Sequence, residues 1–180
     1  MATMSSPTLP ANVVLRDAVA ADAQGIWRVH SRAIRASAAS HYTEDELDAW
    51  VERVQPATYL GLLGTRRLVV AERTDGGEPR IVGFAELLPE EAVIEAIYVD
   101  PDWERRGIGT ALARVLEDDV VARGFPWLVS DASLNAVPFY QALGFRQVAL
   151  DHHELAPGVH IACVVMEKHL SGPQGARAPG

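Results

Sequence analysis

Two glycines and two arginines lie close together in Arg105-Arg106-Gly107-Ile108-Gly109-Thr110, a composition suited to binding an anion. Glycine has no Cβ atom, so a phosphate can approach the backbone amides closely, and the arginines add charge and donors. The first turn of a helix beginning here would offer free N–H groups and a partly positive dipole. The segment therefore predicts a pyrophosphate site, although an ordinary surface loop can have the same composition.

A strand must lead into this turn and a helix must follow it. Residues 93–99 are rich in β-branched and aromatic types, which favour a buried strand, and Pro101 ends it because proline cannot donate to a sheet. Apolar residues then recur at helical spacing from Leu112 to Val120. The turn is thus predicted to join a strand to the start of a helix.

The rest of the chain alternates helical and extended patterns. A helix is expected after Asp22, and a second one after the capping box of Thr43 and Glu46, ending at Pro56. Strands are expected at 13–19, 68–74, 80–88, 127–130, 147–151 and 160–168, and a short helix capped by Asn135. Residues 59–65 fit either a strand or a loop.

Two segments resemble motifs of the GNAT (Gcn5-related) N-acetyltransferases. Residues 97–113 (IYVDPDWERRGIGTALA) are similar to the family's acetyl-CoA-binding segment, and residues 132–145 (ASLNAVPFYQALGF) to its later motif. Glu104 departs from the pattern, which has glutamine or arginine at that position. A register from Arg106 to Ala111 also fits the pattern, but it misplaces the turn relative to the strand.

The resemblance implies an α/β (α+β) fold, with a mixed, mostly antiparallel sheet of six to seven strands and about four helices. It implies a single domain at 12–170 and direct transfer of an acetyl group from acetyl-CoA to an amine in a ternary complex. By the same resemblance, the backbones of Ile97 and Val99 hold the acetyl and pantetheine groups, and the amides of Arg105, Arg106, Gly107, Ile108, Gly109 and Thr110 hold the pyrophosphate. Asn135 is expected to contact the cofactor arm, with helix capping as the alternative.

Two residues are candidates for proton transfer. The resemblance places Tyr140 near the cofactor sulfur, where a phenol with a pKa near 10 can protonate a thiolate; packing beside Phe139 is the alternative. Glu95 is a carboxylate within an apolar strand, where burial would raise its pKa and suit it as a base. Strand alternation predicts Glu91, Glu95 and Ile97 on one side. An ion pair with a neighbouring arginine remains the alternative for Glu95.

The acceptor pocket is expected beside the first two helices, where His41 and Tyr42 lie in a loop; His41 is also a further candidate for the base. His30 and Trp50 lie on apolar helix faces and are expected to pack in the core. Adjacent histidines such as His152 and His153 point to opposite faces of a strand, so we expect no metal site.

Composition narrows the class of protein. The 180 residues are 48% hydrophobic and 22% charged with a net charge of -8, as in a soluble globular domain. No basic surface indicates nucleic acid or an anionic membrane as a partner, and no signal-peptide core is found, so we expect a cytoplasmic protein. Cys163, the single cysteine, is expected to be a buried thiol. Residues 1–11 and 171–180 are expected to be flexible.

The sequence leaves two classes of function open. One is an N-acetyltransferase that acts on a small amine, an amino-acid derivative or a peptide amino group. The other is a GNAT-like sensor that binds acetyl-CoA without turnover. The acceptor has no transferable motif, because acceptor pockets are built from loops and helix edges. A homodimer is the family-level expectation.

Overall fold

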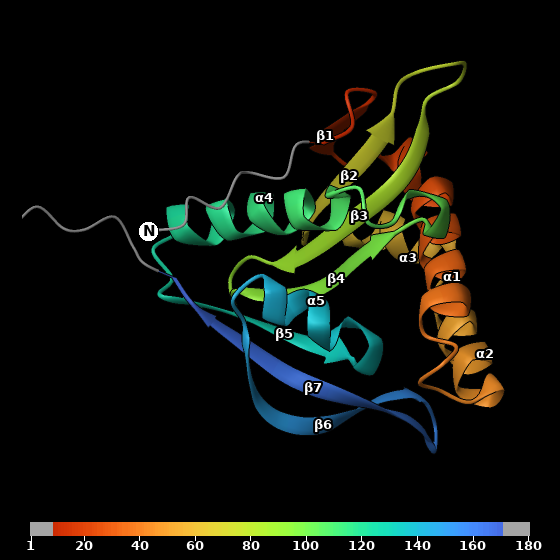
Figure 1. Cartoon of the computed structure of the whole chain (residues 1–180). Helices are drawn as coiled ribbons and strands as arrows, with labels where there is room; N and C mark the ends of the chain where they lie inside the picture. The colour runs from red at the N-terminus through yellow and green to blue at the C-terminus, as the bar shows by residue number, and fades with distance from the viewer. Residues whose placement is uncertain (1–8, 171–180) are drawn as a thin grey trace, which may run out of the picture.

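The computed structural model describes residues 9–170 and is built around a seven-stranded sheet with the strand order β1-β2-β3-β4-β5-β7-β6 (Figure 1). The strands are β1 (Val13–Asp17), β2 (Arg67–Arg73), β3 (Arg80–Leu88), β4 (Val93–Val99), β5 (Trp127–Ser133), β6 (Arg146–Ala156) and β7 (Val159–His169). All neighbouring strands are antiparallel except β4 and β5, which run parallel.

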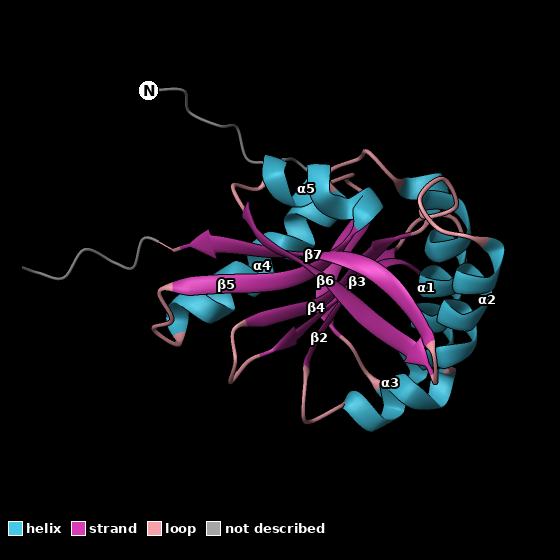
Figure 2. Ribbon diagram, turned by 90° about the horizontal axis from the view of Figure 1, so that it is seen from below, coloured by secondary structure: helices cyan, strands magenta, loops and turns pink. Residues whose placement is uncertain are grey.

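Helices cover both faces of this sheet. They are α1 (Ala23–Ser37), α2 (Glu44–Arg53), α3 (Pro56–Leu62), α4 (Ile108–Ala122) and α5 (Val137–Ala142). Val82 and Ala85 of β3 join the hydrophobic cluster under α4, whereas Ile81 and Phe84 join the cluster under α1. A β-bulge at Val82, which has no partner on β2, interrupts the alternation of side chains along this strand. Figure 2 shows α1, α2 and α3 grouped together on one side of the molecule.

The predicted fold class and the mostly antiparallel sheet are confirmed, with five α-helices where about four were expected. The additional helix, α3, begins at Pro56, which the sequence indicated only as the stop of the preceding helix. Proline is tolerated in a first helical turn because the N–H that it lacks has no partner there. The capping box is confirmed, since the Thr43 N–H donates to Glu46 Oε2 at 2.7 Å and the Glu46 N–H to Thr43 Oγ1 at 3.4 Å.

The predicted flexible ends lie, apart from residues 9–11, outside the described residues. Between residues 9 and 170, no helix is long and apolar enough to cross a lipid bilayer.

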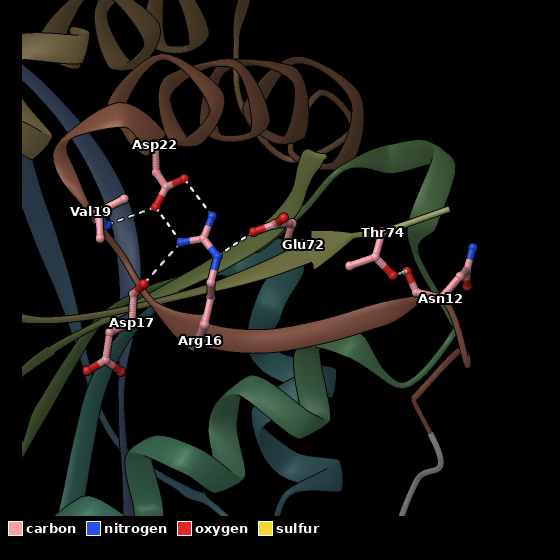
Figure 3. Close-up of polar contacts among 7 residues, drawn as sticks. All are labelled: Asn12, Arg16, Asp17, Val19, Asp22, Glu72 and Thr74. Atoms are coloured by element: carbon pink, nitrogen blue, oxygen red, sulfur yellow. Dashed lines mark hydrogen bonds and ion pairs between the residues drawn. The ribbon is translucent and has the colours of Figure 1, made fainter. Parts of the chain in front are cut away.

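Arg16 joins β1, β2 and the start of α1 (Figure 3). Its guanidinium donates to both carboxylate oxygens of Asp22, at 2.7 and 2.9 Å, and to Glu72 on β2. The Asp22 side chain, 8% exposed, also accepts from the Val19 N–H at 2.8 Å. Burial acts to raise the pKa of Asp22, but the hydrogen bonds and charge of Arg16, together with the Val19 amide, hold it below its ordinary value.

The Arg16→Ala variant should lose about 1–2 kcal/mol of unfolding free energy, because it leaves two nearly buried carboxylates without a counter-charge. The expected loss is smaller than for a fully buried ion pair, because the Arg16 side chain is 35% exposed and solvent screens its charge. The low folded-state pKa of Asp22 means that this stabilisation is present at neutral pH and is lost as the pH falls through that pKa. Urea unfolding at pH 7 measures the change. Arg123→Ala, which breaks an exposed pair with Glu90, is the control; an equal loss in both variants would contradict this account.

Candidate active site

β4 and β5 pair only near their starts and then separate. Val93 pairs with Val129 and Ile94 with Ser130, and beyond this point β5 pairs only with β7. The other edge of β4 remains paired with β3 as far as Val99. The separation leaves a wedge between the carboxyl-terminal halves of β4 and β5.

Pairing with β3 fixes the direction of the backbone groups of β4. The Asp100 N–H donates to the Val82 carbonyl at 2.8 Å, so these two residues form a hydrogen-bonded pair. Opposed residues of an antiparallel ladder alternate between hydrogen-bonded and non-hydrogen-bonded pairs. Val99 and Ile97, opposite Gly83 and Ala85, therefore direct their N–H and C=O groups away from β3 and into the wedge.

The turn after β4 leads into an uncapped helix. Arg105 and Gly107 have positive φ angles of 58° and 80°, and the left-handed conformation is unfavourable for a residue with a side chain such as arginine. Gly107 is the N-cap of α4, no side chain caps this end, and its first turn has no acidic residue. Within residues 9–170, the N–H groups of the first helical turn from Ile108 to Thr110 have no acceptor. The turn thus presents free donors and a positive dipole end.

The side chains of the turn are arranged differently from the prediction. The Arg106 guanidinium lies 4.8 Å from the Trp103 ring centre and donates to the Asp102 carbonyl at 3.0 Å. A Cβ atom at Gly109 would lie 3.2 Å from the Phe139 ring, so close packing of α4 against α5 is itself a reason for a glycine there. Glu104, the departure from the family pattern, accepts a hydrogen bond from Ser37 at 2.5 Å.

A small cavity of about 70 Å³, here called the turn-side cavity, lies between α1 and the ends of β4 and β5. It is bordered by residues that include Ser37, Tyr98, Val99, Ser133 and Asn135. Asn135 lies in a 3₁₀ turn (Leu134–Ala136), and the N-cap of α5 is Ala136, so the expected capping role is wrong. The Asn135 Oδ1 atom is buried and has no partner in the described part of the chain, which leaves an acceptor for a ligand.

A second cavity of about 310 Å³, here called the acidic cavity, lies between the sheet and α1, α2 and α3. It shares Trp50, Tyr98 and Ser133 with the turn-side cavity, so the two meet at these residues. Its polar lining consists mainly of charged side chains and histidines: His30, Arg53, Arg66, Glu86, Glu95, Asp131 and His153. Sequence reasoning selected only Glu95 from this set as a site residue.

Glu95 lies at a β-bulge. Glu86 is opposite Ala96 and Leu87 is opposite Ile94, which leaves Glu95 without a partner on β3. A bulge interrupts side-chain alternation, so Ile97 packs on the α4 side whereas Glu95 lines the acidic cavity. The predicted common side for Glu95 and Ile97 is therefore wrong. The predicted burial of Glu95 is also wrong, because its side chain is exposed.

Glu86 has the buried environment that was expected for Glu95. It is 9% exposed, and its nearest cation, Arg66 Nε, lies 3.9 Å from Glu86 Oε1. Burial, and then the nearby charge of Glu95, raise the pKa of Glu86 to about 7 against the opposing effect of Arg66. The signal that sequence reasoning missed is that Glu86 is the single acidic residue between Ile81 and Leu88.

Tyr140 is 4% exposed and packs between Phe139 and Phe145, whose ring centres each lie 5.2 Å away. Burial raises the pKa of Tyr140 to about 12, although the Ser130 hydroxyl opposes part of the rise. Tyr140 does not border the turn-side or the acidic cavity. Its phenol is therefore a weaker acid than expected, and its catalytic role stays a prediction.

The two residues predicted to bind the acceptor lie outside both cavities. His41 is exposed, and its Nδ1 lies 2.9 Å from Ser40 Oγ. The Tyr42 hydroxyl donates to the Ala162 carbonyl and accepts from the Leu134 N–H, each at 2.8 Å. Tyr42 thus joins the α1–α2 loop to β7, and Trp50 of α2 borders the acidic cavity instead.

The expected core positions of His30 and Cys163 are confirmed, and both residues also line the acidic cavity. Burial lowers the pKa of His30 to about 3, so its ring is neutral; Nδ1 lies 2.6 Å from the Tyr59 hydroxyl and Nε2 has no partner within residues 9–170. Burial, with the charges of Asp131 and Asp151, raises the pKa of Cys163 to about 11. No three potential metal ligands converge in the described residues.

Comparison with known proteins agrees with this architecture. The family described as "Acetyltransferase (GNAT) domain" matches residues 38–170. The [ribosomal protein bS18]-alanine N-acetyltransferase of Salmonella typhimurium is 31% identical over 129 residues, which cover 68% of this chain and 82% of that protein.

Two solved structures extend the comparison. A GCN5-related N-acetyltransferase from Rhodopseudomonas palustris has a TM-score of 0.80 and 30% identity, covering 91% of this chain and 99% of its own. The PaiA N-acetyltransferase of Thermoplasma acidophilum, solved in complex with coenzyme A, has a TM-score of 0.72 and 19% identity, covering 88% and 99%.

Proposed function

Because this chain belongs to the GNAT family of acyl-CoA-dependent N-acetyltransferases, we propose that its acyl donor is acetyl-CoA and that its acceptor is a small amine bound in the acidic cavity. The observation that carries the proposal is the wedge between β4 and β5. Free backbone groups of Ile97 and Val99 point into this wedge, and the uncapped end of α4 is the next α-helix along the chain, after a 3₁₀ turn at Pro101–Trp103.

Acetyl-CoA matches the groups that the wedge offers. Ile97 and Val99 supply N–H and C=O groups for the acetyl and pantetheine amides, and Asn135 Oδ1 supplies a buried acceptor beside them. The amides from Arg105 to Thr110 supply donors for the pyrophosphate. A structurally similar acetyltransferase, PaiA, was solved with coenzyme A, which supports the same class of donor.

Two side chains divide the proton transfers. Glu86 takes the proton from the incoming ammonium, through a water where contact is not direct, because its raised pKa suits a base near neutral pH. The freed amine attacks the thioester carbonyl, an N–C bond forms, the C–S bond breaks, and the proton that the nitrogen then loses passes to the thiolate. Tyr140 donates a hydrogen bond to the departing thiolate. With a pKa of about 12 it acts mainly by stabilising this charge, since an ordinary thiol has a pKa of about 8.5.

The non-catalytic sensor is not favoured, because the relatives named above are N-acetyltransferases.

The proposed unit is one domain covering 12–170. A homodimer remains the family-level expectation. Val148 and Leu150 on the outer strand β6 are 56% and 72% exposed, which favours that strand as a contact.

A calorimetric titration with acetyl-CoA, followed by a thiol-release assay with a set of amines, tests the proposal. Gly107→Val should weaken acetyl-CoA binding by at least about tenfold, because a β-branched residue opposes the φ of 80° and narrows access to the free amides. Gly124→Val, at a φ of 81° beyond the opposite end of α4, is the control for backbone strain. Equal affinities in wild type and Gly107→Val would refute the turn assignment, and absence of thiol release with every amine would refute the transferase proposal.

A further inference from the structure

Three carboxylates from three neighbouring strands line the acidic cavity at one level of the sheet. Glu86 on β3 is opposite Ala96, and the bulged residue Glu95 precedes Ala96 on β4. Asp131 on β5 follows Ser130, the partner of Ile94. All three side chains border the cavity, and the bulge is what brings Glu95 to the same side as Glu86.

None of these carboxylates accepts a hydrogen bond from residues 9–170. Glu86 is the clearest case, because it is 9% exposed and its contact with Arg66 at 3.9 Å is too long for a hydrogen bond. A largely buried side chain whose carboxylate borders a cavity without a donor favours a ligand that donates. The neighbouring unpaired nitrogen, Nε2 of His30, also indicates a polar occupant.

The cavity lining has more carboxylates than guanidinium groups. Arg53 binds His153 and donates to the Glu154 carbonyl at 2.8 Å, and Arg66 lies 3.9 Å from Glu86 with its buried Nη1 unpaired within residues 9–170. Three carboxylates against two guanidinium groups give the lining a net negative charge. A ligand with a free carboxylate would face three like charges, whereas a ligand cation would relieve their repulsion.

Along strands β4 and β5, the three carboxylates lie about two residues before the residues at which the acidic cavity meets the turn-side cavity. Ser133 on β5 marks that meeting point and lies two residues beyond Asp131. Tyr98 on β4 also marks it, two residues beyond Ala96, which is the partner of Glu86. A strand rises about 3.3 Å per residue, so the separation is roughly 7 Å. A chain of four or five methylene groups spans about this distance between two nitrogen atoms.

We infer that the acceptor is a compact aliphatic diamine, with four or five carbon atoms between its nitrogens, whose second ammonium is held by Glu95 and Asp131. The inference rests on the proposed function. One amine of the acceptor lies where Tyr98 and Ser133 meet the donor, passes its proton through water to Glu86 and forms the N–C bond. The thioester C–S bond breaks, the second proton that the attacking nitrogen loses converts the thiolate to a thiol, and the product is a monoacetylated diamine that keeps one positive charge.

A matched set of acceptors tests the inference: 1,4-diaminobutane, butylamine, 4-aminobutyrate and an alanine-initiated tripeptide, each with acetyl-CoA. We expect kcat/KM for 1,4-diaminobutane to exceed that for butylamine by at least about tenfold, the equivalent of about 1.4 kcal/mol, with 4-aminobutyrate poorest. Calorimetric titration of 1,4-diaminobutane supplies a readout that is independent of turnover, and this binding should weaken as salt is raised.

Glu95→Gln and Asp131→Asn should each lower the ratio of kcat/KM for the diamine to kcat/KM for butylamine by about five- to tenfold, because only the diamine has a second charge to hold. Glu95→Gln should also change the rates of both amines together, since the Glu95 charge contributes to the raised pKa of Glu86. Glu52→Gln, an exposed carboxylate on α2, is the matched control and should change neither. Butylamine or the tripeptide reacting as well as the diamine would overturn the inference while leaving the transferase intact. Thiol release with none of the acceptors, in a protein that binds acetyl-CoA, would overturn both, and failure to bind acetyl-CoA would show that the proposed function itself is wrong.

Discussion

The Glu86→Gln variant is expected to lower kcat/KM for the best amine by about 10²- to 10⁴-fold, the usual effect of removing a general base. Glutamine keeps the shape of the side chain but cannot accept the proton. The affinity for acetyl-CoA should be unchanged, because Glu86 lies on β3 and does not border the turn-side cavity. Steady-state kinetics with calorimetry on the same samples separate these two effects.

The pH profile provides a second readout of the same variant. With the pKa of Glu86 raised to about 7, wild-type kcat/KM should rise as the pH increases through 7, because the base must be ionised in the free enzyme. The variant should lose this inflection and keep only the rise that comes from deprotonation of the amine in solution. An inflection near 7 that persists in Glu86→Gln would assign the base to another group.

Stability should change in the opposite direction to activity. The folded-state pKa of Glu86, about 7, lies above its ordinary value of 4.5, so between these two values the folded state holds a proton that the unfolded chain has lost. Wild-type stability therefore falls as the pH rises from 4.5 to 7. Relative to Glu86→Gln, the wild type should lose at most about 3 kcal/mol between pH 5 and pH 8 in urea unfolding. Glu52→Gln, with an exposed side chain, should follow the wild type.

Tyr140→Phe is expected to lower kcat by about 10- to 100-fold with little change in the affinity for acetyl-CoA. The estimate corresponds to one hydrogen bond to a charged group, because the variant removes only the donor to the departing thiolate. The aromatic packing with Phe139 and Phe145 is retained in the variant, so its melting temperature should stay close to that of the wild type.

Leaving-group dependence gives the control for Tyr140. An acyl thioester whose thiol has a lower pKa needs less stabilisation as it departs, so the difference between wild type and Tyr140→Phe should shrink with such a donor. Turnover in Tyr140→Phe that equals the wild type would instead support the packing interpretation that its burial among aromatic rings also allows.

The sequence by itself determined the fold class and the placement of the turn. The periodicity of apolar residues shows which face of each strand and helix is buried. The glycine-bearing turn at Arg105–Thr110 lies between a strand and a helix that are consecutive in the sequence, so its position could be predicted from the residues on either side of it. The capping box of Thr43 and Glu46 is equally local. These features depend on residues a few positions apart, so the sequence pattern was sufficient to predict them.

The lining of the acceptor cavity depended on tertiary structure. Glu86 and Asp131 are 45 residues apart along the chain, and only the strand order β3-β4-β5 brings them to one level. Glu95 was placed wrongly because one bulged residue reverses the face of every side chain beyond it, and a bulge has no clear sequence pattern. His41 and Tyr42 were chosen for their loop position, whereas the hydrogen bonds of Tyr42 to Ala162 on β7 and to Leu134 join segments that are far apart in the sequence. The charge, the burial and the distances between side chains at this site depend on which residues are neighbours in the folded protein. Those neighbours are far apart in the sequence, so their contacts could not be predicted from it.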